Sequence, residues 1–191
     1  MHPEIIKILE HAAKKRFECH FNTNFTFINE EIIKKLVSLS AIQIHINVSL
    51  WAACAESYVR THPNKTRDTF YRIIDMLKLF ARLKTVRHVP HINIYNVISK
   101  FNFAEIYEMV KLAYDVGADS VQFVPMDSVN GKTEHLLSDE HEKKEALIQL
   151  KKAKAFLDSD LKNKAGANLF ICDYEQITRR FLSENAKKGD V

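Results

Sequence analysis

Residues 42–50 read Ile-Gln-Ile-His-Ile-Asn-Val-Ser-Leu, and this stretch decides the fold. Its apolar and polar residues alternate strictly. Successive side chains of a β-strand point to opposite faces, so the pattern predicts a strand with one aliphatic and one polar face. The aliphatic set is Ile42, Ile44, Ile46 and Val48, and the polar set is Gln43, His45, Asn47 and Ser49.

Strand and helix patterns alternate on both sides of this stretch. Further strands are predicted at residues 17–24, 91–99 (opened by Pro90), 120–126 and 168–172. Helices are predicted at residues 2–16, 66–84 and 138–160. Two more are predicted to begin after the caps Asn29 and Asp173, and another runs from the capping-box-like Asn102 and Glu105 to Gly117. A long loop is predicted at 51–65. Short βα units of this kind predict a parallel sheet with right-handed crossovers.

The predicted strands share one polar face. Its members are His20, Asn22 and Asn24; Gln43, His45, Asn47 and Ser49; His91, Asn93 and Tyr95; and Ser120 and Gln122. Open doubly wound sheets are usually apolar on both faces, whereas one polar concave face is typical of a barrel that holds a polar ligand. We therefore expect an α/β fold, a partial (β/α) TIM-like barrel of parallel strands, as one domain over residues 1–191.

Composition narrows the class of protein. The chain has 191 residues, 46% of them hydrophobic, which is enough for one core. Its net charge of +4 is spread along the chain, so nucleic-acid binding is not expected. No apolar run spans a membrane, and three widely spaced cysteines (Cys19, Cys54 and Cys172) fit a reducing cytoplasm.

Familiar catalytic motifs do not account for the polar face. Ser49 lacks a GxSxG elbow, and four glycines leave no phosphate-binding loop. His88 and His91 lie at the amino end of a predicted strand, whereas ligands of parallel sheets lie at the carboxyl ends. A metal-dependent hydrolase is thus a minor alternative, no metal ligand is assigned, and the catalytic residues stay unknown.

The sequence resembles the radical S-adenosylmethionine enzymes, in the branch with a C-terminal auxiliary-cluster (SPASM-type) domain. The segments that carry the resemblance are CHFNTNFTFINEEIIKKL (19–36), INVSLWAACAESYVRTHPNKT (46–66), HINIYNVIS (91–99) and GADSVQFVPMDSVNGKT (117–133), and His2-Pro3-Glu4 resembles the helix start that follows the family's GGEP motif. The resemblance implies a partial barrel in which a CxxxCxxC-bound 4Fe–4S cluster cleaves S-adenosylmethionine reductively, giving a radical that abstracts a substrate hydrogen.

Carried over residue by residue, the resemblance implies a cofactor site. Ser49 matches the serine of the family's VSL motif, and Asn22 to Asn24 match the polar part of its TNG turn. Residues Gln122 and Met126 fall on the sixth-strand edge near the adenine, while Asn93 and Tyr95 point inward. The implied S-adenosylmethionine-binding residues are Asn22, Asn24, Ser49, Asn93, Tyr95, Gln122 and Met126.

The chain also departs from the family pattern. Phe25 stands where the family has glycine, in a turn that needs a positive φ. No CxxxCxxC motif is present, so the cluster ligands are not in this chain. We expect a fragment of a radical enzyme, lacking the first strands and the auxiliary domain and inactive alone.

An alternative function, an oligomeric state and a substrate question stand beside the fragment interpretation. A non-catalytic binding module with a nucleoside-type polar cleft is the alternative function. The first strand, with an unpaired edge along residues 17–24, predicts self-association. The substrate, a small molecule or a peptide, is undetermined.

Overall fold

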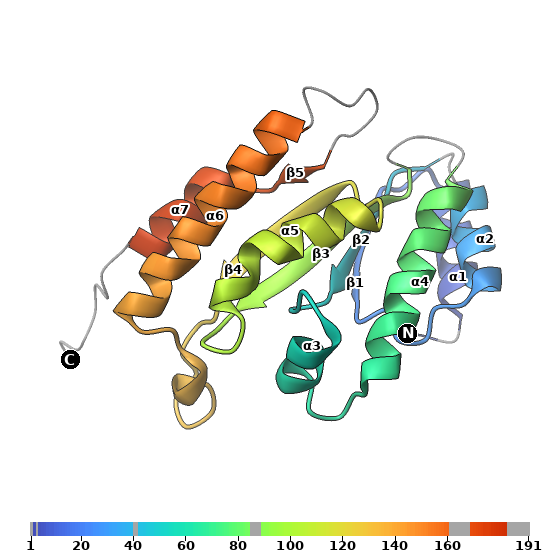
Figure 1. Ribbon diagram of the computed structural model, residues 1–191. Helices are drawn as coiled ribbons and strands as arrows, with labels where there is room; N and C mark the ends of the chain where they lie inside the picture. Colours follow the sequence, from blue (N-terminus) through green and yellow to red (C-terminus); the bar gives the residue numbers. More distant parts are fainter. Residues whose placement is uncertain (1, 3, 40–41, 85–88, 161–168, 183–191) are drawn as a thin grey trace, which may run out of the picture.

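The computed structural model describes residues 2, 4–39, 42–84, 89–160 and 169–182. Five parallel strands form one sheet in the order β1-β2-β3-β4-β5 (Figure 1). Their bounds are β1 Cys19–Thr23, β2 Ile44–Ser49, β3 His91–Ile98, β4 Ser120–Pro125 and β5 Phe170–Ile171. The α/β fold with a parallel sheet, predicted from the sequence, is therefore confirmed.

Helices alternate with the strands along the described chain. They are α1 Ile5–Lys14, α2 Glu30–Ser38, α3 Ala55–Thr61, α4 Arg67–Leu83, α5 Ile106–Asp115, α6 Glu140–Asp160 and α7 Tyr174–Leu182, with short 3₁₀ turns at Phe103–Glu105 and Glu134–Leu136. Figure 1 shows α4 and α5 lying over the strands, with α6 and α7 beyond them next to β5. Of the helices described, none is long and apolar enough to cross a membrane.

The register places the aliphatic residues of the strands on one face. Ile46 pairs with Phe21 on one side and with Ile92 on the other, and Ile94 pairs with Val121. These side chains pack against the helices. The core that they form with the helices includes Ile44, Ile46, Val48, Ile92, Ile94, Val121, Phe70, Ile73, Leu77, Phe80, Ile106 and Val110.

Local chemistry sets the helix ends. The side chain of Asn29 accepts a hydrogen bond from the backbone N–H of Ile32 at 2.9 Å, as the sequence predicts for a helix cap. After α5, Gly117 has a φ of +73°, and a Cβ there would lie 2.7 Å from the Cβ of Ala81. Glycine is thus required both by the turn and by the close approach of α4.

Three predicted segments differ from the structure. Residues 51–65 are not one long loop, because α3 buries Tyr58 there. Its N-cap is Cys54, whose backbone N–H bonds to the Ser57 hydroxyl. Cysteine is not among the residues preferred at an N-cap, so the sequence pattern did not predict this helix start. The first strand is shorter than 17–24. The last is confined to Phe170–Ile171, and the predicted start at Asn168 lies outside the described residues.

Candidate functional site

The polar face of the sheet is organised in rows that run across the strands. At the amino ends, His20 pairs with His45 and His45 pairs with His91. Two residues further along, Asn22, Asn47, Asn93 and Ser120 lie in register. Two residues beyond these, Ser49, Tyr95 and Gln122 form a third row at the carboxyl ends. The polar face predicted from the alternation is therefore present.

The middle row is a chain of side-chain hydrogen bonds. Asn47 donates to the Oδ1 of Asn22 at 2.8 Å, and Asn93 donates to the Oδ1 of Asn47 at 3.0 Å. The Oδ1 of Asn93 accepts from the Ser120 hydroxyl at 2.9 Å, and its Nδ2 also reaches Gln122 at 3.3 Å. Asn93 is 6% exposed. Its amide is thus a structural centre of the face, joined to both neighbouring strands.

The carboxyl-end row is different. Within the part of the chain that the structure describes, the hydroxyls of Ser49 and Tyr95 make no hydrogen bond, although both residues are half-buried. Gln122 reaches only the long contact of 3.5 Å to Asp173 and the bond from Asn93. Half-buried polar groups that lack protein partners are available to a bound ligand.

Two valines adjoin the row of Ser49, Tyr95 and Gln122. Val97 pairs with Val124, two residues beyond Tyr95 and Gln122, and both valines are half-buried. Met126 follows on the same side, and its backbone N–H donates to the Ile98 carbonyl at 2.8 Å. The carboxyl end of the polar face therefore combines hydroxyl and amide groups with an aliphatic surface.

In the turn after β1, the side chain of Asn24 is engaged in local hydrogen bonds. The Oδ1 of Asn24 accepts from the N–H of Thr26 at 3.2 Å and from its hydroxyl at 2.8 Å. Phe25 has a φ of +60° and is 1% exposed. The turn does require a positive φ, as predicted, and burial of the ring in the core offsets the strain of a bulky residue in that conformation.

The turn after β2 is fixed by residues that the sequence analysis did not identify as site residues. Trp51, which has a φ of +57°, donates its backbone N–H to Asn96 at 3.0 Å. Its carbonyl accepts from Asn102 at 2.9 Å, and Glu105 accepts from the N–H of Ala53 at 3.2 Å. Neither Asn102 nor Glu105 makes a side-chain cap bond. The Oδ1 of Asn102 accepts instead from the N–H of Ser99 at 2.8 Å, and the carboxylate of Glu105 bonds to Ala53 and Arg60.

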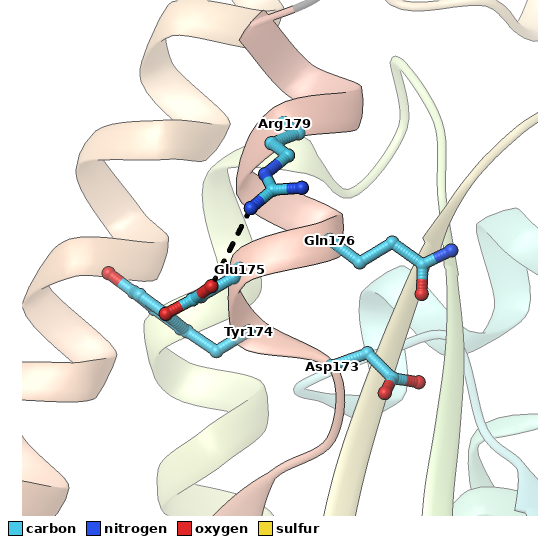
Figure 2. A pocket seen from close by; sticks show the side chains of 5 residues that line it. All are labelled: Asp173, Tyr174, Glu175, Gln176 and Arg179. Carbon is cyan, nitrogen blue, oxygen red and sulfur yellow. Dashed lines mark ion pairs between the residues drawn. The ribbon is translucent and has the colours of Figure 1, made fainter.

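Asp173 joins the polar face to α7. It has a φ of +52°, so that a positive φ follows β1, β2 and β5 at the second residue after each strand. A shallow hollow lies here, lined by Asp173, Tyr174, Glu175, Gln176 and Arg179. Figure 2 shows Asp173 and Gln176 extending toward the strands, while Glu175 pairs with Arg179 at 3.7 Å. This ion pair is fully solvated and contributes little.

The three cysteines do not form a cluster site. Cys19 begins β1, Cys54 precedes α3 and Cys172 follows β5, and they form no set of converging metal ligands in the structure described. Burial raises the pKa of the Cys172 thiol, and the neighbouring Asp173 carboxylate raises it further. A 4Fe–4S cluster needs several converging thiolates, so the cysteines present do not fit this group.

Known proteins share this architecture. No family model matches the chain. Crystal structures of Streptococcus suis SuiB superpose on it over most of its length. The complex with S-adenosylmethionine gives a TM-score of 0.63 at 16% identity and covers 94% of this chain and 39% of SuiB. The complex with the precursor peptide SuiA gives 0.61 at 16% identity and covers 99% and 40%.

The chain has the fold of the matching part of SuiB. The partial barrel that the sequence resemblance implies is thereby confirmed. One curated protein is also similar, the tungsten-containing aldehyde ferredoxin oxidoreductase cofactor-modifying protein of Pyrococcus furiosus, at 22% identity over 121 residues. The match covers 63% of this chain and 33% of that protein. The chain thus spans about a third of this relative and about two fifths of SuiB.

Proposed function

We propose that this chain is a barrel module of the radical S-adenosylmethionine type, which binds S-adenosylmethionine at the carboxyl ends of β2, β3 and β4. The observation that carries the proposal is the row of Ser49, Tyr95 and Gln122, whose two hydroxyls have no partner among the described residues. Ligands of parallel βα folds lie at this end of the sheet.

The chemistry of the row suits the cofactor. Hydroxyl and amide groups both donate and accept, as the amino, carboxylate and ribose groups of S-adenosylmethionine require. The half-buried Val97 and Val124 offer an apolar surface for an adenine ring. The likeness to SuiB, whose structure holds S-adenosylmethionine, supports the same assignment. In this proposal Met126 lies near the adenine, and Asn22, Asn24 and Asn93 shape the site around it.

Radical chemistry would need an iron–sulfur cluster, and the cysteines described above do not hold one. We infer that a cluster must be provided by residues other than Cys19, Cys54 and Cys172, and no reaction step is assigned to this chain. The alternative function, a nucleoside-binding module without redox chemistry, is favoured by this same lack of converging cysteines. Anaerobic reconstitution with iron and sulfide separates the two cases, because stoichiometric iron on the chain alone would contradict the inference.

Isothermal titration of the full chain with S-adenosylmethionine tests the binding site. We expect saturable binding and a loss of about three- to tenfold in affinity for Ser49→Ala, the effect of one hydrogen bond. Ser38→Ala is the matched control, because Ser38 is exposed on α2 and bonds only to the Lys35 carbonyl. Equal affinities for wild type and Ser49→Ala, or no binding by wild type, would overturn the proposal.

A peptide is the proposed class of substrate. The support is that SuiB, which shares the fold, was crystallised with its precursor peptide SuiA. The test is to add peptides to the chain loaded with S-adenosylmethionine and to measure the affinity of the loaded chain for each peptide. Small molecules of non-peptide chemistry that bind in place of peptides would argue against this class.

Self-association through β1 is a further proposal. β1 is an end strand of the described sheet and pairs there only with β2. An unpaired strand edge is a template for pairing with another chain. Light scattering at tens of micromolar should give a mass above 22.1 kDa, whereas a clean monomer would count against it.

A further inference from the structure

Glu18, His20 and His45 bring three metal-ligating atoms together at the amino end of the sheet. His20 and His45 are register partners on adjacent parallel strands, so their side chains leave the same face. Glu18 lies two residues before His20, which places it on that face as well. One ligand atom from each residue lies within 4.8 Å of the other two.

The carboxylate already bridges the two imidazoles. The Oε1 of Glu18 lies 2.8 Å from the Nε2 of His20 and 3.2 Å from the Nε2 of His45. Bonds of 2.0–2.1 Å to a tetrahedral Zn²⁺ hold ligand atoms about 3.3 Å apart. The spacing of the carboxylate to each ring is therefore close to that of a coordination sphere.

The two rings need to turn before they can share a metal. They are stacked, with centroids 4.3 Å apart and planes 4° from parallel, so their nitrogen lone pairs run side by side. The side chain of His20 is 60% exposed and that of His45 is 30% exposed. Solvent on this side leaves room for both rings to rotate toward a common point.

We propose that Glu18, His20 and His45 bind a divalent transition-metal ion, with Zn²⁺ as the ion of choice and water in the remaining position. Two imidazoles and one carboxylate suit Zn²⁺, whereas Mg²⁺ and Ca²⁺ prefer sites made of oxygen ligands. The neighbouring ring of His91 packs against His45 at 5.3 Å, and its Nε2 bonds to the Ser120 hydroxyl at 2.8 Å. His91 therefore supports the pair and belongs to the amide network.

This metal site is separate from the proposed cofactor site. His45 and Ser49 lie four residues apart on β2, about 13 Å at the rise of a strand. A bound ion would join β1 to β2 through side chains, in addition to their backbone hydrogen bonds. Binding of the metal and of S-adenosylmethionine can thus succeed or fail independently.

Titration of the untagged, metal-free full chain with Zn²⁺ against a chromophoric chelator tests the proposal. We expect one Zn²⁺ per chain and at least about tenfold weaker binding for His45→Gln and for Glu18→Gln. His141→Gln, at an exposed histidine outside the cluster, should bind as wild type does. Far-UV circular dichroism verifies that each variant is folded, and Glu18→Gln changes only an exposed side chain.

Cobalt gives a second measurement. Co²⁺ bound by nitrogen and oxygen ligands shows d–d bands without the sulfur charge-transfer band that cysteine ligation would add. Absence of Zn²⁺ binding, unchanged affinity in both ligand variants, or a sulfur charge-transfer band lost on Cys19→Ser would each overturn the proposal.

Discussion

The two ends of the polar face use their polar side chains in different ways. Toward the amino end, Asn93 donates to Asn47 across the strands, and the rings of His20 and His45 stack. At the carboxyl end, the hydroxyls of Ser49 and Tyr95 have no partner among the described residues. One alternating pattern therefore yields a hydrogen-bonded framework in one place and a row of unpartnered hydroxyls, the proposed ligand site, in another.

The comparison predicts that the amino end governs stability. The largest effect is expected for Asp119→Ala, because Asp119 accepts hydrogen bonds from Lys84 and from the N–H of Ile92. Both charged side chains are less than 10% exposed. Removal of one partner leaves a buried charge, so the free energy of unfolding should fall by about 3–5 kcal/mol in urea denaturation. The control Asp115→Ala, at an exposed residue, should change the free energy of unfolding by less than about 0.5 kcal/mol.

Asn93→Ala should have the next largest effect. It leaves the amide of Asn47 and the hydroxyl of Ser120 without their shared partner inside the sheet. We expect a loss of about 2–3 kcal/mol in the free energy of unfolding. Asn22→Ala, at the exposed end of the same row, is the control and should cost less than about 1 kcal/mol. Equal losses at the two positions would show that the row is not a cooperative network.

The carboxyl end should give the opposite result. Tyr95→Phe removes a hydroxyl that bonds to nothing described, so the stability should change by less than about 0.5 kcal/mol. Its affinity for S-adenosylmethionine should nevertheless drop about three- to tenfold in calorimetry. Tyr71→Phe, at an exposed tyrosine of α4, should alter neither quantity. A large loss of stability in Tyr95→Phe would erase the distinction between the two ends.

The smallest effect concerns His62, which stacks on Tyr58 at 4.4 Å and contacts Trp51. Burial lowers its pKa below the ordinary value of 6.5. The unfolded chain therefore binds the proton more readily, and the stability should fall as the pH drops below about 6.5. His62→Gln should flatten this dependence between pH 7.5 and 5 in urea midpoints. An unchanged slope would assign the acid sensitivity to other groups.

Alternation along single strands was enough to predict the sheet and its polar face. It placed Ser49, Asn93, Tyr95 and Gln122 on one side, and the structure puts them there. The positive φ at Phe25 was also anticipated from the turn. Contact with S-adenosylmethionine stays a prediction at all of these positions.

Features that depend on the register between strands were not accessible from the sequence. The meeting of His45 with His20 and Glu18 joins residues 25 and 27 positions apart. Likewise, the hydrogen bonds of Trp51 to Asn96 and to Asn102 span 45 and 51 positions. Polar side chains that fix distant backbone look like ordinary strand or cap residues until their partners are known.

The order of the strands has a consequence for how the chain reaches its fold. Each strand lies beside the strand that precedes it in the sequence, from β1 through β5. During synthesis, every new strand can dock on an edge that the ribosome has already released, without waiting for a later segment. The sheet can therefore lengthen one βα unit at a time, and β5, with two residues, is the shortest of the strands described.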